Sequence, residues 1–187
     1  MSIQPIETRY RGYRFRSRLE AKWAVFFDAA KIRWLYEPQG FVVDGRPYLP
    51  DFYLPDIGCY FEVKPTSEYD LDFLQSFAYE VGENVVVAEG GIPDPAEWAC
   101  EPRIQLRVLY SVKPEECPDG FVDGMAWGYN DMFLQCDNCG CICIMNEVYS
   151  TMKNNCGACG DSHARWMPLS FALETARGAR FEHGERG

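Results

Sequence analysis

The stretch that decides the fold is residues 48–65, with the sequence YLPDFYLPDIGCYFEVKP. Its two ends, residues 48–54 and 59–64, are rich in aromatic and branched side chains, which favour extended structure. Residues 55–58 between them read PDIG and have turn chemistry, because proline presets φ and glycine accepts a positive φ. The stretch therefore predicts two strands joined by a turn.

The second predicted strand, residues 59–64, brings a carboxylate and an amine to one surface. Side chains alternate along a strand, so Glu62 and Lys64 share a face, and Asp51 can approach Glu62 if the two strands pair. Two converging carboxylates repel each other unless a cation lies between them. Few hard oxygen ligands suit Mg²⁺ or Mn²⁺, and a nearby lysine can position or deprotonate a water or offset phosphate charge. These residues are candidates for metal-assisted phosphodiester hydrolysis.

A helix is predicted to begin at Ser17. The sequence from Ser17 to Glu20 fits a capping box, in which the Glu20 carboxylate binds the Ser17 amide. Apolar residues then follow at helical spacing, namely Leu19, Trp23, Phe26, Phe27 and Ala30. Glu20 also shares a face with apolar residues that would look toward the sheet. It therefore has two interpretations, as a structural cap or as a member of an acidic site.

Further elements are predicted in order along the chain. Residues 32–36 and 41–43 are predicted as short strands, and Asp44-Gly45 signals a tight hairpin leading to the strand that carries Asp51. A second helix is predicted to be capped by Ser67 and ended by Gly82. Residues 84–88, NVVVA, read as a strand buried on both faces. The expected order is helix, three strands, helix and strand.

The pairing of Pro50-Asp51 with Glu62-Val63-Lys64, ten residues further on, resembles the PD-(D/E)XK nuclease superfamily. Residues 16–24, RSRLEAKWA, are similar to the first-helix motif of its resolvase-like and transposon-end-cleaving branches. The resemblance implies an α/β fold with a restriction-endonuclease-like αβββαβ core. It also implies a Mg²⁺-dependent DNA endonuclease, similar to phage and prophage proteins that process phage or mobile-element DNA. Many members act as dimers, so a homodimer is a further implication.

The same resemblance implies roles for individual residues. Asp51, Glu62 and the Val63 carbonyl would bind Mg²⁺ or Mn²⁺, and Lys64 would orient or activate the attacking water. Glu20 would support a second metal or the water shell.

Charge is distributed unevenly along the chain, whose net charge is −10. Residues 1–64 have a balance of +2, and residues 65–187 one of −12. An early stretch interleaves aromatic residues with arginines, a pattern that suits phosphate contact and base stacking. The alternative, purely structural interpretation is a solvated segment that enters a helix. The arginines predicted to contact nucleic acid are Arg9, Arg11, Arg14, Arg16 and Arg18.

Six of the nine cysteines fall between residues 136 and 159, and a cluster of this kind without a secretion signal points to metal. Two C-x-x-C-G knuckles separated by sixteen residues predict a zinc ribbon with one structural Zn²⁺. Either Cys141 or Cys143 could replace a knuckle cysteine, although both are interpreted as packing residues, and His163 is a minor candidate ligand. The four predicted ligands are Cys136, Cys139, Cys156 and Cys159.

The expected organisation has three parts. Residues 1–90 form the nuclease core, residues 91–134 a sheet extension or connector, and residues 135–187 the zinc ribbon with a C-terminal helix. Composition is that of a globular protein, with 47% hydrophobic and 25% charged residues, so a real core can form. No signal peptide or membrane-length apolar run is evident, which predicts the cytoplasm, or the host cytoplasm if the protein is phage-encoded.

A second hypothesis belongs to another functional class. In it, the nuclease fold is a non-catalytic scaffold that binds a protein partner, such as a host defence component or a recombinase. The acidic remainder of the chain and the closed cysteine site favour this alternative. The presence of Asp51, Glu62 and Lys64 in catalytic order favours the nuclease.

Overall fold

The computed structural model of the protein describes residues 5–94, 105–113, 131–146, 153–154 and 156–181. Within these ranges the helices are α1 (Arg18–Ala30), α2 (Leu71–Val81) and α3 (Ser170–Gly178). The strands are β1 (Thr8–Tyr10), β2 (Tyr13–Phe15), β3 (Leu35–Tyr36), β4 (Phe41–Val43), β5 (Arg46–Tyr48), β6 (Phe52–Leu54), β7 (Cys59–Lys64), β8 (Asn84–Glu89), β9 (Gln105–Leu109), β10 (Asp131–Cys136), β11 (Ile142–Asn146), β12 (Lys153–Asn154) and β13 (Ala164–Pro168).

A nine-stranded sheet dominates the described residues, in the order β12-β13-β10-β9-β8-β7-β6-β3, with β11 also beside β10. The β7–β8 pair is parallel, and the pairs on either side of it, β6–β7 and β8–β9, are antiparallel. A parallel pair requires a crossover connection, and α2 provides it. Because Phe52 pairs with Phe61, the residue before β6 lies opposite Glu62. This register brings the two ends of the decisive stretch together.

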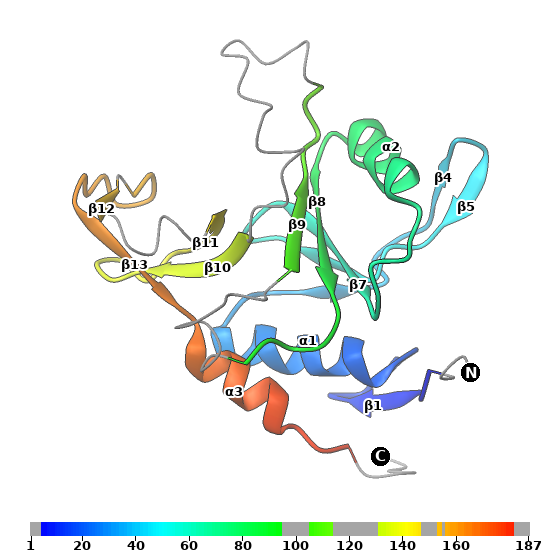
Figure 1. Cartoon of the computed structure of the whole chain (residues 1–187), viewed down its shortest axis with the longest axis horizontal. Helices are drawn as coiled ribbons and strands as arrows, with labels where there is room; N and C mark the ends of the chain where they lie inside the picture. Colours follow the sequence, from blue (N-terminus) through cyan, green and yellow to red (C-terminus); the bar gives the residue numbers. More distant parts are fainter. Residues whose placement is uncertain (1–4, 95–104, 114–130, 147–152, 155, 182–187) are drawn as a thin grey trace.

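Two layers cover the sheet. Helices α1 and α3 pack on one face, and α2 with the β4–β5 hairpin packs on the other (Figure 1). The alternation of β7 divides its side chains between them, since Phe61 joins the core beneath α1 and Tyr60 joins the core beneath α2. Trp23 of α1 meets Phe61 edge-on, with ring centroids 4.8 Å apart. Strand β7 is thus the central element around which both cores form.

The local signals at the helix ends explain where the helices begin and stop. Ser17 caps α1 by accepting a hydrogen bond from the Glu20 amide, at 3.2 Å. Helix α2 begins after Asp70, whose carboxylate accepts from the Phe73 amide. The predicted cap at Ser67 was therefore wrong by three residues, because aspartate caps as well as serine does. The predicted stop at Gly82 is confirmed, with a φ of 68°.

The decisive stretch is confirmed in part. The turn at residues 55–58 and the strand at residues 59–64 are as predicted, and Asp44-Gly45 closes the β4–β5 hairpin. Residues 48–54, however, are not one strand. The structure ends β5 at Tyr48 and begins β6 only at Phe52. Pro50 lies in the gap and has no amide to donate to a ladder, so the chain leaves one sheet and enters another there.

The sheet continues across both expected domain boundaries. Strand β9 pairs with β8, β10 pairs with β9, and β13 pairs with β10. The described parts of the expected connector therefore extend the sheet, and the cysteine-rich segment is joined to it by hydrogen bonds. Residues 95–104 and 114–130 lie outside the described residues.

The C-terminal helix α3 packs on α1. Lys22 of α1 donates to the Arg177 carbonyl at 3.2 Å, and Ala172, Leu173 and Ala176 enter the core beneath α1. The described residues thus form a mixed α/β fold with a largely sheet core. Its assignment to the restriction-endonuclease-like class stays a prediction.

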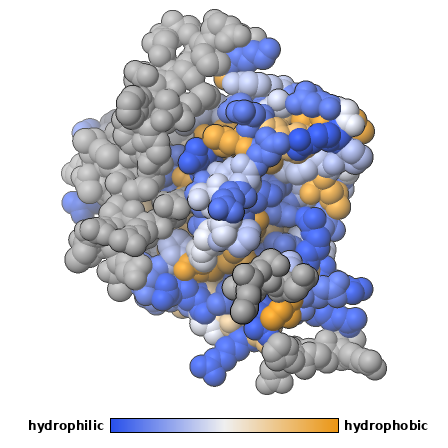
Figure 2. All heavy atoms as spheres, turned by 45° about the vertical axis from the view of Figure 1, so that its right-hand side comes forward, coloured by the Kyte–Doolittle hydropathy of each residue, from blue (hydrophilic) through white to orange (hydrophobic). Residues whose placement is uncertain are grey.

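On the face shown in Figure 2, hydrophilic residues cover most of the described surface and hydrophobic residues form separate areas. Val42 and Phe171 are the most exposed large hydrophobic residues among those described, at 68% and 73%. None of the helices in the described ranges combines the length and the apolar character that crossing a membrane requires.

Candidate functional site

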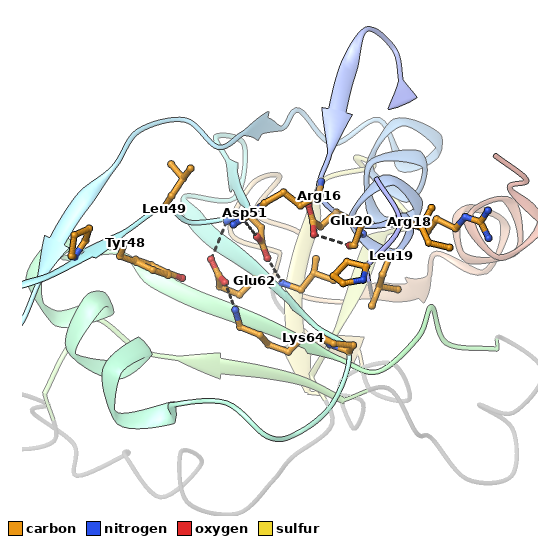
Figure 3. Close-up of a pocket in the computed structure, with 15 residues that line it drawn as sticks. Arg16, Arg18, Leu19, Glu20, Tyr48, Leu49, Asp51, Glu62 and Lys64 are labelled. Atoms are coloured by element: carbon orange, nitrogen blue, oxygen red, sulfur yellow. Dashed lines mark hydrogen bonds and ion pairs between the residues drawn. The ribbon is translucent and has the colours of Figure 1, made fainter. Parts of the chain in front are cut away.

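A pocket of about 800 Å³ gathers the side chains that the sequence singled out (Figure 3). Glu20 comes from α1, Asp51 from the gap before β6, and Glu62 and Lys64 from β7. The three carboxylate residues are only 7%, 5% and 1% exposed, in that order. The structure therefore brings all four predicted catalytic residues into one cavity.

Asp51 and Glu62 are fixed to each other through the backbone. The Asp51 amide donates to the Glu62 carboxylate at 3.0 Å, and the Val63 amide donates to Asp51 Oδ2 at 2.8 Å. This reciprocal pair depends on the break between β5 and β6, which frees the Asp51 amide from any ladder. The two carboxylates thus stand side by side, each held by the backbone of the other's strand.

Two cations compensate the buried carboxylates. Lys64 Nζ lies 2.7 Å from Glu62 Oε2, on the same side of the sheet. Arg16 Nη2 lies 2.6 Å from Asp51 Oδ1, and Arg16 Nε lies 2.8 Å from Glu37. Arg16 was predicted as a nucleic-acid contact, yet in this structure its guanidinium is part of the carboxylate pocket.

Glu20 takes part in the helix cap and also lies in the pocket, while its role in a catalytic site stays a prediction. Its carboxylate accepts hydrogen bonds from the Ser17 hydroxyl at 2.7 Å, the Tyr36 hydroxyl at 2.7 Å and the Arg16 amide at 3.1 Å. The reciprocal cap contact thus reaches the Arg16 amide, one residue before the amide expected from the capping box. Glu20 lines the pocket at the same time, so capping does not remove it from the site.

The pKa shifts of Asp51 and Lys64 show how far Arg16 and Lys64 offset the negative charge of the pocket. Burial, and then the charge of Glu62, raises the pKa of Asp51 above its usual range. Burial alone would lower the pKa of Lys64, but Glu62 outweighs it and the pKa is raised. Lys64 is therefore an ammonium at neutral pH, and Asp51 would be stabilised by a further cation.

Tyr48 adds an unexpected hydroxyl. It lines the pocket and points toward Glu62 (Figure 3). Burial, and then the neighbouring Glu62 carboxylate, raise its pKa, so the hydroxyl keeps its proton. A protonated hydroxyl in this position can donate a hydrogen bond to Glu62 or to a ligand atom in the pocket.

The oxygen donors of the carboxylate pocket are of the type that a hard cation takes, but they do not all converge on one point. Asp51, Glu62 and the Val63 carbonyl are oxygen donors of the kind that Mg²⁺ or Mn²⁺ takes. The three carboxylates nevertheless do not converge on one point, because they bind arginine, lysine and amides. Among the described residues, the convergent set of metal-ligating side chains is a different one, the four cysteines.

The ligand sulfurs of Cys136, Cys139, Cys156 and Cys159 all lie within 4.8 Å of one another. The two knuckles repeat the same backbone bonds, since the Gly140 amide donates to the Cys136 carbonyl and the Gly160 amide to the Cys156 carbonyl. Both glycines have a φ of 73°, which favours glycine. The predicted four-thiol arrangement is confirmed as a cluster that could bind a structural metal such as Zn²⁺.

Electrostatics around the second knuckle favour a thiolate. A hydrogen bond from the Cys159 amide is the main reason that the pKa of Cys156 is lowered, to about 6. Cys139 Sγ lies 3.7 Å from Cys156 Sγ. Four cysteine ligands around one metal form a closed, structural type of site.

The remaining candidate ligands lie outside the convergent set. Cys141 and Cys143 pack on the main core as predicted, but Cys141 Sγ also lies 3.3 Å from Cys156 Sγ. His163 is exposed, with its Nδ1 3.0 Å from the Ser162 hydroxyl. Cys141, which the sequence offered as an alternative ligand but favoured as a packing residue, is therefore a close neighbour of the cluster.

The other arginines that were predicted to contact nucleic acid lie on the β1–β2 hairpin and at the start of α1. Arg9, Arg11 and Arg14 belong to the β1–β2 hairpin, where Arg11 pairs with Asp28 and Arg14 with Glu7. Arg18 begins α1 and lines the carboxylate pocket.

Sequence reasoning missed three members or neighbours of the pocket, namely Tyr36, Glu37 and Tyr48. Tyr48 begins the decisive stretch, and its place two residues before the Pro-Asp pair could have suggested it. Nothing in the sequence linked Tyr36 or Glu37 to Glu20 or Arg16, because these contacts span the fold.

Comparison with known proteins adds no identification: no family model, no curated protein and no solved structure matches this chain.

Proposed function

We propose that this protein is a metal-dependent DNA endonuclease that hydrolyses phosphodiester bonds. The observation that carries the proposal is the meeting of Asp51, Glu62 and Lys64 in one pocket, with the Lys64 amine held by Glu62. The resemblance of Pro50-Asp51 and Glu62-Val63-Lys64 to the PD-(D/E)XK motif supports it. The parallel β7–β8 pair with its α2 crossover agrees with the core that this resemblance implies.

Asp51, Glu62 and the Val63 carbonyl would hold Mg²⁺ or Mn²⁺. The bound ion would polarise the phosphate and lower the pKa of a water. The raised pKa of Asp51 supports this role, because a cation relieves the same electrostatic penalty that otherwise favours a proton.

Lys64 acts as a charge stabiliser in this proposal. Its pKa is raised by Glu62, so at neutral pH it donates hydrogen bonds and offsets developing negative charge on the phosphate. Deprotonation of the water by the Lys64 amine is less favoured for the same reason. Glu20 holds the Arg16 amide, the Ser17 hydroxyl and the Tyr36 hydroxyl, and so orders the wall of the pocket.

The test is DNA cleavage by wild type and Lys64→Ala. Purified protein is incubated with circular, linear and branched DNA plus Mg²⁺ or Mn²⁺. Wild type should cut at least one of these substrates, and Lys64→Ala should cut it at least about a hundredfold more slowly. Lys113→Ala is the matched control, because Lys113 is exposed and does not line the pocket.

Circular dichroism shows whether the Lys64 variant folds, since it leaves the buried Glu62 without its partner. Lys64→Arg serves as a second variant, because it keeps the positive charge but moves it. Equal cleavage by wild type and both folded variants would contradict the assigned role. Absence of cleavage on every substrate, with a bound protein partner, would favour the scaffold alternative.

A further inference from the structure

A second groove lies between the β1–β2 hairpin and the end of α3, with a volume of about 1020 Å³. Arg9, Arg11 and Arg14 line it from the hairpin, and Arg180 and Phe181 line it from the segment after α3. It shares no lining residue with the carboxylate pocket. Arginines from both ends of the chain therefore meet in one groove of a protein whose net charge is −10.

Some of the arginines in this groove have no carboxylate partner among the described residues. Arg9 and Arg14 are direct cross-strand partners in the hairpin, and like charges in that position destabilise a strand pair. Glu7 compensates Arg14. Arg9 and Arg180 are exposed, and neither forms an ion pair with a carboxylate in the described ranges. Two arginines are thus available to an anionic ligand.

The groove also presents aromatic surface beside the arginines. Tyr13 is 42% exposed, and its ring is held against Trp34 with centroids 4.9 Å apart. Phe181 meets Tyr10 edge-on at 6.2 Å. A supported but exposed ring next to arginines is the combination with which proteins hold single-stranded nucleic acid, through stacked bases and paired phosphates.

The hairpin connects this groove to the carboxylate pocket. Arg14 lines the groove, and Arg16, two residues later, binds Asp51. A strand rises about 3.3 Å per residue, so the chain between these two arginines spans roughly 7 Å. A nucleic-acid strand lying along β2 would therefore run from the groove toward the carboxylates.

We propose that this groove binds a single-stranded segment of the DNA substrate, with Arg9 and Arg180 on its phosphates and Tyr13 against a base. The inference rests on the proposed function and names the form of DNA that the same site takes. Sequence position alone did not suggest Arg180, which joins the hairpin arginines only through the packing of α3 on α1.

The experiment measures fluorescence anisotropy of a labelled twelve-nucleotide oligothymidylate, and of a blunt duplex, over a range of salt concentrations, with neither Mg²⁺ nor Mn²⁺ added. The test protein carries Arg9→Gln with Arg180→Gln, and a second carries Tyr13→Ala. The charge-matched control carries Arg33→Gln with Lys113→Gln, two exposed cations outside the groove. Omitting Mg²⁺ and Mn²⁺ prevents cleavage, and omitting chelator leaves the cysteine cluster its metal, so binding is read alone.

Wild type should bind the single strand more tightly than the duplex. The double arginine variant should bind it about tenfold more weakly, with a salt slope smaller by about 1.4, because each lost phosphate contact removes about 0.7. Tyr13→Ala should weaken binding about fivefold or more, with no change of slope. The control should retain at least half of the wild-type affinity.

The proposal would be overturned if the double arginine variant and its control bound the single strand with equal affinity. It would also be overturned if wild type bound the duplex more tightly than the single strand. If the groove variants then cut DNA and Lys64→Ala does not, the proposed nuclease function stands and only the proposed binding of a single strand in the groove is rejected. If wild type neither binds nor cuts any DNA, both proposals fail together.

Discussion

The carboxylate pocket and the cysteine cluster are both candidate metal sites, yet they are built in opposite ways. The cluster takes its four thiols from two knuckles with the same local backbone bonds, and its sulfurs converge. The pocket takes its acids from α1, the gap before β6 and β7, and each acid already binds an internal cation or amide. The difference teaches that a closed soft site is specified by local turns, whereas an open hard site depends on tertiary packing and stays electrostatically adjustable.

The largest expected effect comes from breaking the cysteine cluster. Elemental analysis of protein purified without chelator should find one Zn²⁺ per chain, and Cys156→Ser should lose it. Structural zinc contributes about 10–16 kcal/mol in small zinc-dependent peptides, so the segment around β10–β13 should lose its cooperative thermal transition. Cys143→Ser is the control and should retain the ion, because Cys143 lies outside the convergent set.

Cys141→Ser sharpens the same prediction. Its sulfur contacts Cys156 but does not belong to the four that converge, so one Zn²⁺ should remain. Loss of zinc from Cys141→Ser, or its absence from wild type, would show that the assignment of the four knuckle cysteines as ligands is wrong.

An intermediate effect is expected at Arg16, which holds the pocket together without a metal. Arg16→Gln removes the ion-pair partner of the buried Asp51. Without added Mg²⁺ or Mn²⁺ it should lower the free energy of unfolding by only about 2 kcal/mol, because Arg16 itself is half exposed. The same change uncovers Asp51, the carboxylate proposed to bind the metal. Mn²⁺ should therefore raise the melting temperature of Arg16→Gln more than that of wild type.

Arg33→Gln is the matched control, since it breaks the exposed ion pair with Asp56 and should leave the response to Mn²⁺ unchanged. A Mn²⁺ response of Arg16→Gln that is equal to or smaller than that of wild type would mean that Arg16 and the ion do not compete for Asp51.

The smallest effect concerns Asp131, on the strand β10 that links the sheet to the cysteine cluster. Burial raises its pKa from 3.8 to about 6, although the Val108 amide donates to it. The native state therefore binds this proton more tightly than the unfolded state. The contribution of Asp131 to stability is greatest below pH 3.8 and is lost as pH rises through its folded pKa of about 6. Asp131→Asn should remove the fall and stabilise the protein at pH 7 by about 1–2 kcal/mol, after allowance for its partial exposure.

Urea unfolding of wild type and Asp131→Asn at pH 4 and pH 7 measures this effect. Because β10 enters the first knuckle, zinc content should be the same in both proteins. A variant that is equally stable to wild type at pH 7 would show that the Asp131 carboxylate is better solvated than its burial indicates.

Several features could be read from the sequence because they depend on neighbours in the chain. The turn at residues 55–58, the alternation of residues 59–64 and the stop at Gly82 follow from local backbone preferences. The C-x-x-C-G knuckles belong to the same group, since glycine permits the positive φ that each knuckle requires. Spacing was enough to predict these features because both partners of each contact lie within a few residues.

The pocket could be predicted only in part. Side-chain alternation put Glu62 and Lys64 on one face, but the break at Pro50 and the pairing of Arg16 with Asp51 were not visible. Such contacts join segments dozens of residues apart, and their strength depends on burial, which no single stretch fixes.

The sequence by itself therefore determined the strand at residues 59–64, the turns, the thiol knuckles and the identity of the candidate catalytic groups. Only the tertiary structure decided where the chain breaks between β5 and β6, which partners hold each carboxylate, and that Arg180 joins the hairpin arginines through the packing of α3 on α1. The physical reason is range, because backbone conformation is set within a few residues, whereas electrostatic compensation is set by whatever the packed core brings close.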